Sequence, residues 1–135
     1  MSRKTFAVIL AALGALNCAS VAVVTWLSVA SYQSMWPFPA LFLIETTILG
    51  IGGVWLVYQH TGWRRLVRWI VPGCLSVIVV LGVWSIGFFL LPAALAFLIT
   101  AFIGEQKAEA RWYEKLISFA AGIIGQLLFF LLGRI

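Results

Sequence analysis

A long uncharged stretch, residues 69–104, constrains the fold of this chain more than any other feature of its sequence. As a single helix it would extend ~54 Å at ~1.5 Å per residue, whereas the hydrocarbon core of a bilayer is only ~30 Å thick. Trp84 and Ser85 lie near its centre, between two glycines. Because glycine and serine suit tight turns and tryptophan prefers a membrane interface, we interpret the stretch as a helical hairpin with short helices over about 69–84 and 89–104.

The alternative is one tilted span over about residues 69–91, kinked at Pro92, which gives four spans in total. The positive charges separate the two topologies. With the N-terminus inside, the hairpin leaves all of the nine Lys and Arg residues except Arg134 on the inner side. The single span instead moves the three basic residues of segment 105–115 outside and Arg134 inside. Since inner loops carry an excess of Lys and Arg, we favour five spans.

The composition of the chain suits lipid rather than water. Hydrophobic residues make up 64% of the 135 residues and charged residues only 10%, too few to cover the surface of a water-soluble protein. We therefore predict an all-α, polytopic membrane protein in which residues 1–135 form a single integral domain. The predicted spans cover about residues 5–30, 40–58, 69–84, 89–104 and 116–133.

The N-terminal segment has the basic start and apolar run of a signal peptide, but its apolar residues continue for about another dozen positions. We therefore retain it as a span. The N-terminus is expected in the cytoplasm and the multi-pass chain in the cell membrane, and the short chain with an uncleaved basic start suits a bacterial plasma membrane. The net charge of +5 comes from residues beside apolar segments, where topology and anionic lipid headgroups explain it without a nucleic-acid partner.

Small side chains recur one helical turn apart in the first and last predicted spans. Rows of this kind let helix backbones approach closely, which is how helices associate within lipid. We expect them to pack within the chain, against a second copy or against another membrane protein. The predicted helix-packing residues are Ala7, Ala11, Ala15, Ala19, Ala121 and Gly125.

Glu45 is the only charged residue inside an apolar segment, and it lies ~10 Å below the outer edge of the second predicted span. A carboxyl group inside a membrane is costly and is by default a functional candidate. We expect it to hydrogen-bond a neighbouring helix or to reach the headgroups. The alternatives are proton or cation coupling and an ion pair with Arg134, which five spans place on the same side. Asn17 and Gln126 are the other intramembrane polar candidates for interhelical hydrogen bonds.

Arg64, Arg65 and Arg68 cluster beside Trp63 and Trp69 in the predicted inner loop. Basic residues with interfacial tryptophans are typical of a collar that binds lipid headgroups and fixes the orientation of the chain.

The sequence shows no Ser/His/Asp set, no paired carboxylates in the spans, no phosphate-binding loop and no Cys/His cluster. Cys18 and Cys74 are expected to be small packing residues, and His60, the only histidine, an interfacial residue. We therefore predict no catalytic residues, no cofactor and no metal site, and we expect the protein not to be an enzyme.

A lone membrane-embedded glutamate in a short multi-span chain resembles the small multidrug resistance transporters, whose carboxyl group binds a proton and a drug cation in turn. Those proteins have four spans with the glutamate in the first, whereas Glu45 falls in the second predicted span. We predict a non-catalytic structural or accessory subunit whose partners are the lipid bilayer and other membrane helices. The alternative, which the resemblance implies, is a small proton- or cation-coupled transporter centred on Glu45.

Overall fold

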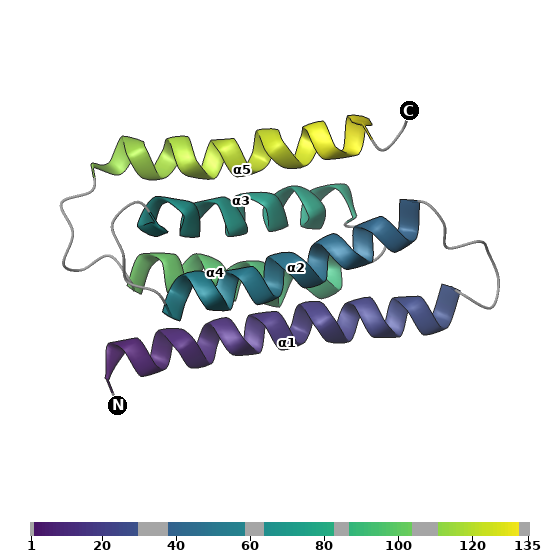
Figure 1. Ribbon diagram of the computed structural model, residues 1–135, viewed down its shortest axis with the longest axis horizontal. Coiled ribbons are helices and arrows are strands. Elements are labelled where there is room, and N and C mark those ends of the chain that lie inside the picture. The colour runs from purple at the N-terminus through teal and green to yellow at the C-terminus, as the bar shows by residue number, and fades with distance from the viewer. Residues whose placement is uncertain (1, 30–37, 59–63, 83–86, 104–110, 133–135) are drawn as a thin grey trace.

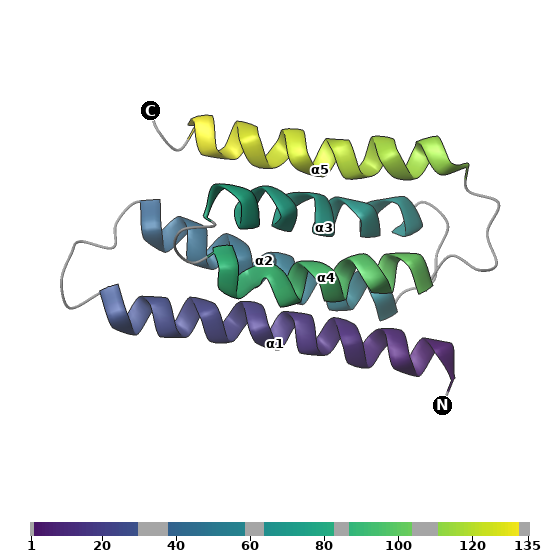
Figure 2. The ribbon, with the colours of Figure 1, turned by 180° about the vertical axis from the view of Figure 1, so that it is seen from behind.

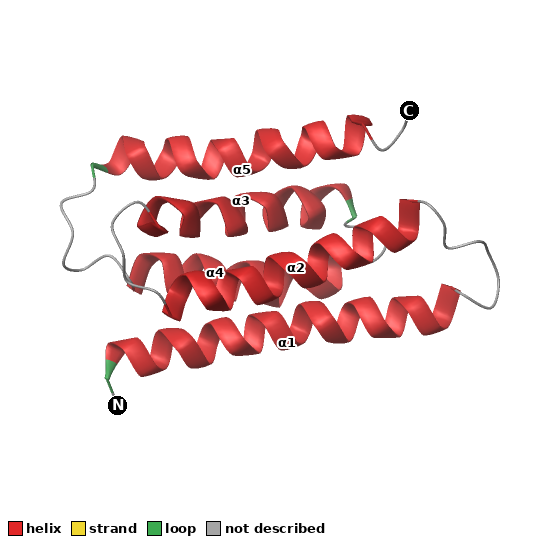
Figure 3. Cartoon of the chain, in the orientation of Figure 1, coloured by secondary structure: helices red, strands yellow, loops and turns green. Residues whose placement is uncertain are grey.

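Five helices make up nearly all of the chain that is described in the computed structural model, which covers residues 2–29, 38–58, 64–82, 87–103 and 111–132 (Figure 1). No strand occurs in these ranges, so the prediction of an all-α fold is confirmed (Figure 3). The helices are α1 (Arg3–Val29), α2 (Phe38–Tyr58), α3 (Arg64–Leu81), α4 (Gly87–Ile103) and α5 (Trp112–Leu132).

Each helix runs opposite to the one before it along the chain, and both views show the same up-and-down order (Figures 1 and 2). We call the end of the bundle where α1 begins the N-end, and the opposite end, where α5 ends, the C-end. The helix α2 therefore begins at the C-end and ends at the N-end. The helix α1 thus starts at the N-end, and α5 finishes at the C-end.

The uncharged central stretch forms two helices, α3 and α4, which confirms the predicted hairpin and contradicts the single helix through residues 69–91. The amide of Gly82 donates a hydrogen bond to the Ile78 carbonyl at 2.9 Å and ends α3, and the Gly87 amide donates to the Gly82 carbonyl at 2.7 Å. A Cβ atom on Gly87 would collide with the backbone of Gly82, so the close start of α4 requires glycine. The helix α3 begins at Arg64 rather than at the predicted start near residue 69, so the basic segment before that residue is helical.

The helix α3 lies at the centre of the bundle, where it packs against α2, α4 and α5. Its Leu75 and Ile78 side chains are fully buried, as is Pro72. Ser76 donates its hydroxyl to the Pro72 carbonyl at 2.7 Å and so satisfies its own polar group within the helix. The helix α1 packs against α2 and α4 on the other side of the bundle.

Three of the five helices are long and apolar enough to cross a membrane: α1 over Arg3–Ser28, α2 over Ala40–Tyr58, and α5 over Trp112–Leu132. The other two contribute shorter apolar helices, Val67–Leu81 and Gly87–Ile103. Among the described helices, only α3 is a close backbone neighbour of α5, and most apolar side chains of α5 are exposed. Such a surface is stable in lipid and unfavourable in water.

Candidate functional site

A side-chain hydrogen bond between two different helices joins Glu45 and Gln126. The Gln126 Nε2 atom donates to Glu45 Oε2 at 3.1 Å, and the two residues lie far apart in sequence, on α2 and α5. Gln126 is only 2% exposed, whereas Glu45 is partly buried. Two of the three predicted intramembrane polar residues are therefore brought together in the half of the bundle nearer the C-end.

The side chains near this pair on α2 and α5 are either apolar or carry hydroxyl groups that form hydrogen bonds within their own helix. Thr46 and Thr47 donate their hydroxyl groups back to carbonyls of their own helix, each at 2.9 Å. The rings of Phe42 and Phe130 lie 6.1 Å apart between the same two helices. Arg134, the predicted ion-pair partner of the carboxyl group, lies outside the described residues, so that pairing stays a prediction.

Asn17, the third predicted polar residue, is placed on α1 away from this pair. Its Oδ1 atom is buried and has no hydrogen-bond partner among the described residues. This oxygen therefore makes no interhelical hydrogen bond within that part of the chain, and the bond expected for the Asn17 side chain stays a prediction. An unsatisfied buried carbonyl oxygen costs roughly 1–3 kcal/mol.

The small residues of α1 lie against its two neighbouring helices. Ala7 and Ala11 are buried, whereas Ala15 and Ala19 are partly buried. A Cβ atom placed on Gly50 of α2 would lie 3.2 Å from the Ala15 Cα atom, which shows how closely the α1 and α2 backbones approach. On the side facing α4, a Cβ atom on α1 residue Gly14 would lie 3.1 Å from the Phe97 ring.

The backbone of α5 approaches that of α3 closely where the two helices cross, at Gly73 and Gly122. A Cβ atom on Gly122 would lie 3.1 Å from the Ile70 Cα atom and closer still to the Ile70 carbonyl oxygen. A Cβ atom on Gly73 would collide in the same way with a backbone carbonyl oxygen of α5. Beside it, the Cys74 thiol donates to the Gly122 carbonyl at 3.3 Å.

The predicted packing pair on α5 lies on a different face. Ala121 is exposed, and a Cβ atom on Gly125 would meet nothing within 4 Å. Within the chain, the packing face of α5 is therefore the one that carries Gly122 and Gln126. The prediction that Ala121 and Gly125 pack against another copy or a partner is left as a prediction.

Arg68 lies inside the bundle rather than on its surface, with a side chain only 7% exposed. Its Nε atom donates to the Leu56 carbonyl at 2.9 Å, in the last turn of α2. A cation at this position complements the free carbonyls at a helix C-terminus. The neighbouring Trp69 is also buried and meets Phe102 of α4 edge-to-face at 4.8 Å. The side chains of Arg64 and Arg65 are not described, so headgroup binding by the cluster stays a prediction.

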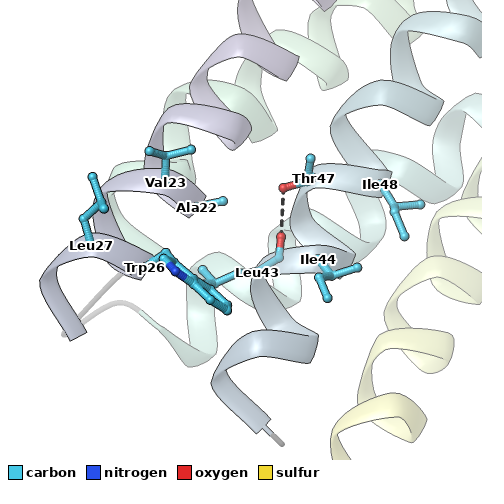
Figure 4. A pocket seen from close by; sticks show the side chains of 8 residues that line it. All are labelled: Ala22, Val23, Trp26, Leu27, Leu43, Ile44, Thr47 and Ile48. Carbon is cyan, nitrogen blue, oxygen red and sulfur yellow. Dashed lines mark hydrogen bonds between the residues drawn. The ribbon is translucent and has the colours of Figure 1, made fainter. Parts of the chain in front are cut away.

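An apolar groove opens between α1 and α2 towards the C-end (Figure 4). It has a volume of ≈350 Å³. The residues that line it are Ala22, Val23, Trp26, Leu27, Leu43, Ile44, Thr47 and Ile48. The sequence did not predict this groove, because a groove depends on the angle between two helices.

Comparison with protein-family models, with curated proteins and with solved structures finds no match for the chain. Its function has to be inferred from the helices and contacts described above.

Proposed function

We propose that all five helices cross a membrane, with the N-end in the cytoplasm. Three helices have the length and apolarity that a span requires. The antiparallel order supports the same role for α3 and α4. They run out and back between α2, which ends at the N-end, and α5, which begins there. Their apolar parts, Val67–Leu81 and Gly87–Ile103, extend roughly 22 and 25 Å and fall short of a ~30 Å core, and local thinning of the bilayer accommodates the difference.

We further propose that the protein is a non-catalytic structural or accessory subunit of the membrane. The observation that carries this proposal is the hydrogen bond from Gln126 to Glu45. It uses the one carboxyl group of the predicted spans to connect α5 to α2, which is a packing role. The apolar outer surface of α5 is then available to lipid or to the helices of a larger complex.

The test is gentle detergent extraction from native membranes, followed by size determination and mass spectrometry of the proteins that co-purify. An accessory subunit is expected to co-purify with a larger membrane protein at fixed stoichiometry. A preparation containing only this chain would contradict that role and favour the second candidate.

The second candidate is a proton- or cation-coupled transporter centred on Glu45. It is favoured by the partial exposure of Glu45, whose carboxyl group receives one hydrogen bond among the described residues, from Gln126. The substitution Glu45→Gln separates the two candidates. It removes the charge but keeps an oxygen that can accept the hydrogen bond, so a structural subunit should still assemble, whereas proton-coupled transport in vesicles should be abolished.

A further inference from the structure

From Asn17 we infer an interface on α1 for a second copy of this chain, an inference that rests on the proposed insertion of the helices and holds for either candidate function. The Asn17 Oδ1 atom is the only buried side-chain nitrogen or oxygen atom without a hydrogen-bond partner in the described part of the chain. By contrast, Gln126 is paired with Glu45, and the Thr46 and Thr47 hydroxyl groups are satisfied within their own helix. A donor for the Asn17 oxygen therefore has to come from outside these residues.

The depth of Asn17 excludes water and lipid headgroups as the source of that donor. Asn17 lies near the middle of the 27-residue helix α1, roughly 18–21 Å along the axis from the two ends. In an inserted helix this position is the centre of the hydrocarbon core, where neither water nor a headgroup donates a hydrogen bond. The donor is therefore a polar group of a protein at the same depth.

A second copy of the chain supplies such a group by symmetry. An asparagine side chain carries both a donor and an acceptor, so two Asn17 amides complement each other. Around a two-fold axis along the membrane normal, two α1 helices lie parallel and Asn17 meets Asn17 at the same depth. Asn17 is partly exposed, so rotation of its amide group presents the oxygen to the other copy. A different protein would need a polar side chain of its own at this depth, whereas the symmetric pair needs no further residue.

The exposed surface of α1 on both sides of Asn17 suits the same pairing. In both views α1 lies at the edge of the bundle opposite α5 (Figures 1 and 2). Side chains spaced alternately four and three positions apart interdigitate between two parallel helices, and a single asparagine among them fixes the register. Through Asn17 this spacing defines a seam whose other members are all exposed or partly exposed: Phe6, Leu10, Leu13, Ser20, Val24 and Leu27.

Cysteine substitutions test which face of α1 meets the second copy. Leu13 and Val24 belong to the seam, whereas Leu16 and Val23 lie on the neighbouring face and are matched controls, since all four side chains are 56–63% exposed. Each chain is reconstituted into vesicles of palmitoyl-oleoyl phosphatidylcholine and oxidised with copper phenanthroline. The unmodified chain gives the background, because Cys18 is buried.

We expect Leu13→Cys and Val24→Cys to form disulfide-linked dimers several-fold faster than Leu16→Cys and Val23→Cys, because the seam positions lie nearest to their own copies across the two-fold axis. Equal rates on the two faces, or faster linkage through the control positions, would overturn the inference.

The role of the amide is tested by the dissociation constant of the dimer, measured from energy transfer between copies labelled at the N-terminus while the vesicles are diluted with lipid. Asn17→Leu keeps a side chain of similar size without a donor or an acceptor. It should raise the dissociation constant roughly 3- to 30-fold, the range for one hydrogen bond between membrane helices. Asn17→Gln keeps an amide and should stay closer to the unmodified chain.

An unchanged dissociation constant in Asn17→Leu, or no energy transfer between copies of the unmodified chain, would overturn the inference. Flotation of the vesicles tests the membrane proposal separately. A chain that does not float with them refutes the insertion itself, whereas a chain that floats without self-association refutes only the interface on α1.

Discussion

The substitution Gly122→Ala should weaken the attachment of α5 to α3, whereas Gly125→Ala in the same helix should not. The added Cβ atom at Gly122 would lie 3.1 Å from both the carbonyl carbon and the Cα atom of Ile70, inside the 3.4–4 Å of ordinary contact. These are backbone atoms, which cannot rotate away as a side chain can. The two helices must therefore move apart by a substantial fraction of an ångström.

The magnitude follows from two opposing effects. Overpacking a well-packed site costs about 1–3 kcal/mol, and backbone atoms on both sides place this contact towards the upper part of that range. Replacing glycine with alanine within a helix gains up to ~1 kcal/mol. That gain is the same at Gly125, where the new methyl group meets nothing within 4 Å. The difference between the two variants thus isolates the steric cost and should be ~1–3 kcal/mol, or roughly 5- to 140-fold in the unfolding equilibrium.

Two measurements test this prediction. The free energy of unfolding is obtained by titrating folded protein in mild micelles with dodecyl sulfate while following circular dichroism. Local opening is followed by maleimide labelling of Cys74, resolved by peptide mass spectrometry, because its thiol is buried against the Gly122 carbonyl. Labelling should accelerate in Gly122→Ala and not in Gly125→Ala. Equal stability and equal labelling in the two variants would refute the close crossing of α3 and α5.

Three further predictions use the same unfolding measurement. Gln126→Leu should lower the free energy of unfolding by roughly 0.6–2 kcal/mol because it removes the donor to Glu45. Glu45→Gln keeps an acceptor and should leave that free energy nearly unchanged. Equal losses in the two variants would contradict the hydrogen bond. Arg68→Met should cost about 1.5–3 kcal/mol because the end of α2 loses a charged donor, and an unchanged stability would contradict that capping role. Gly50→Leu should cost about 1–3 kcal/mol by separating α1 from α2, whereas Gly52→Leu, with open space beside it, serves as the control and should cost far less.

The division of the chain into helices was predictable because it depends on length, and length can be read from a sequence. A stretch as long as residues 69–104 does not fit one crossing of a ~30 Å core, and glycines with a serine mark where it turns. The start of α3 was less predictable. The segment from Arg64 to Arg68 reads as a polar loop, yet it is helical because Arg68 is held against the end of α2. That contact depends on how two helices lie in space, which the sequence of either one does not contain.

The face that α5 turns towards the rest of the chain could have been predicted from the sequence. Two pairs of residues, Ala121 with Gly125 and Gly122 with Gln126, have the same spacing and lie about 100° apart around the helix. Small residues alone do not choose between them. A polar side chain in a membrane helix faces the bundle interior, and this rule applied to Gln126 places Gly122 on the same inner face. The partner Glu45 remained undetermined, because three polar residues in the spans permit several pairings.

The way α5 is attached explains why this fold suits lipid. The main cluster of buried side chains comes from the other four helices, and α5 adds only the partly buried Phe130 to its edge. In water a helix attached so lightly would expose most of its apolar surface at a large cost. In lipid that surface costs little, so the attachment depends on backbone proximity and on polar pairs instead. The chain supplies both kinds of contact: the crossing at Gly122, where Cys74 also donates to the Gly122 carbonyl, and the hydrogen bond at Gln126, one helical turn away on the same face. Under the proposed insertion, the remaining apolar faces of α5 would contact lipid or another membrane protein, which is the contact that the proposed accessory role needs.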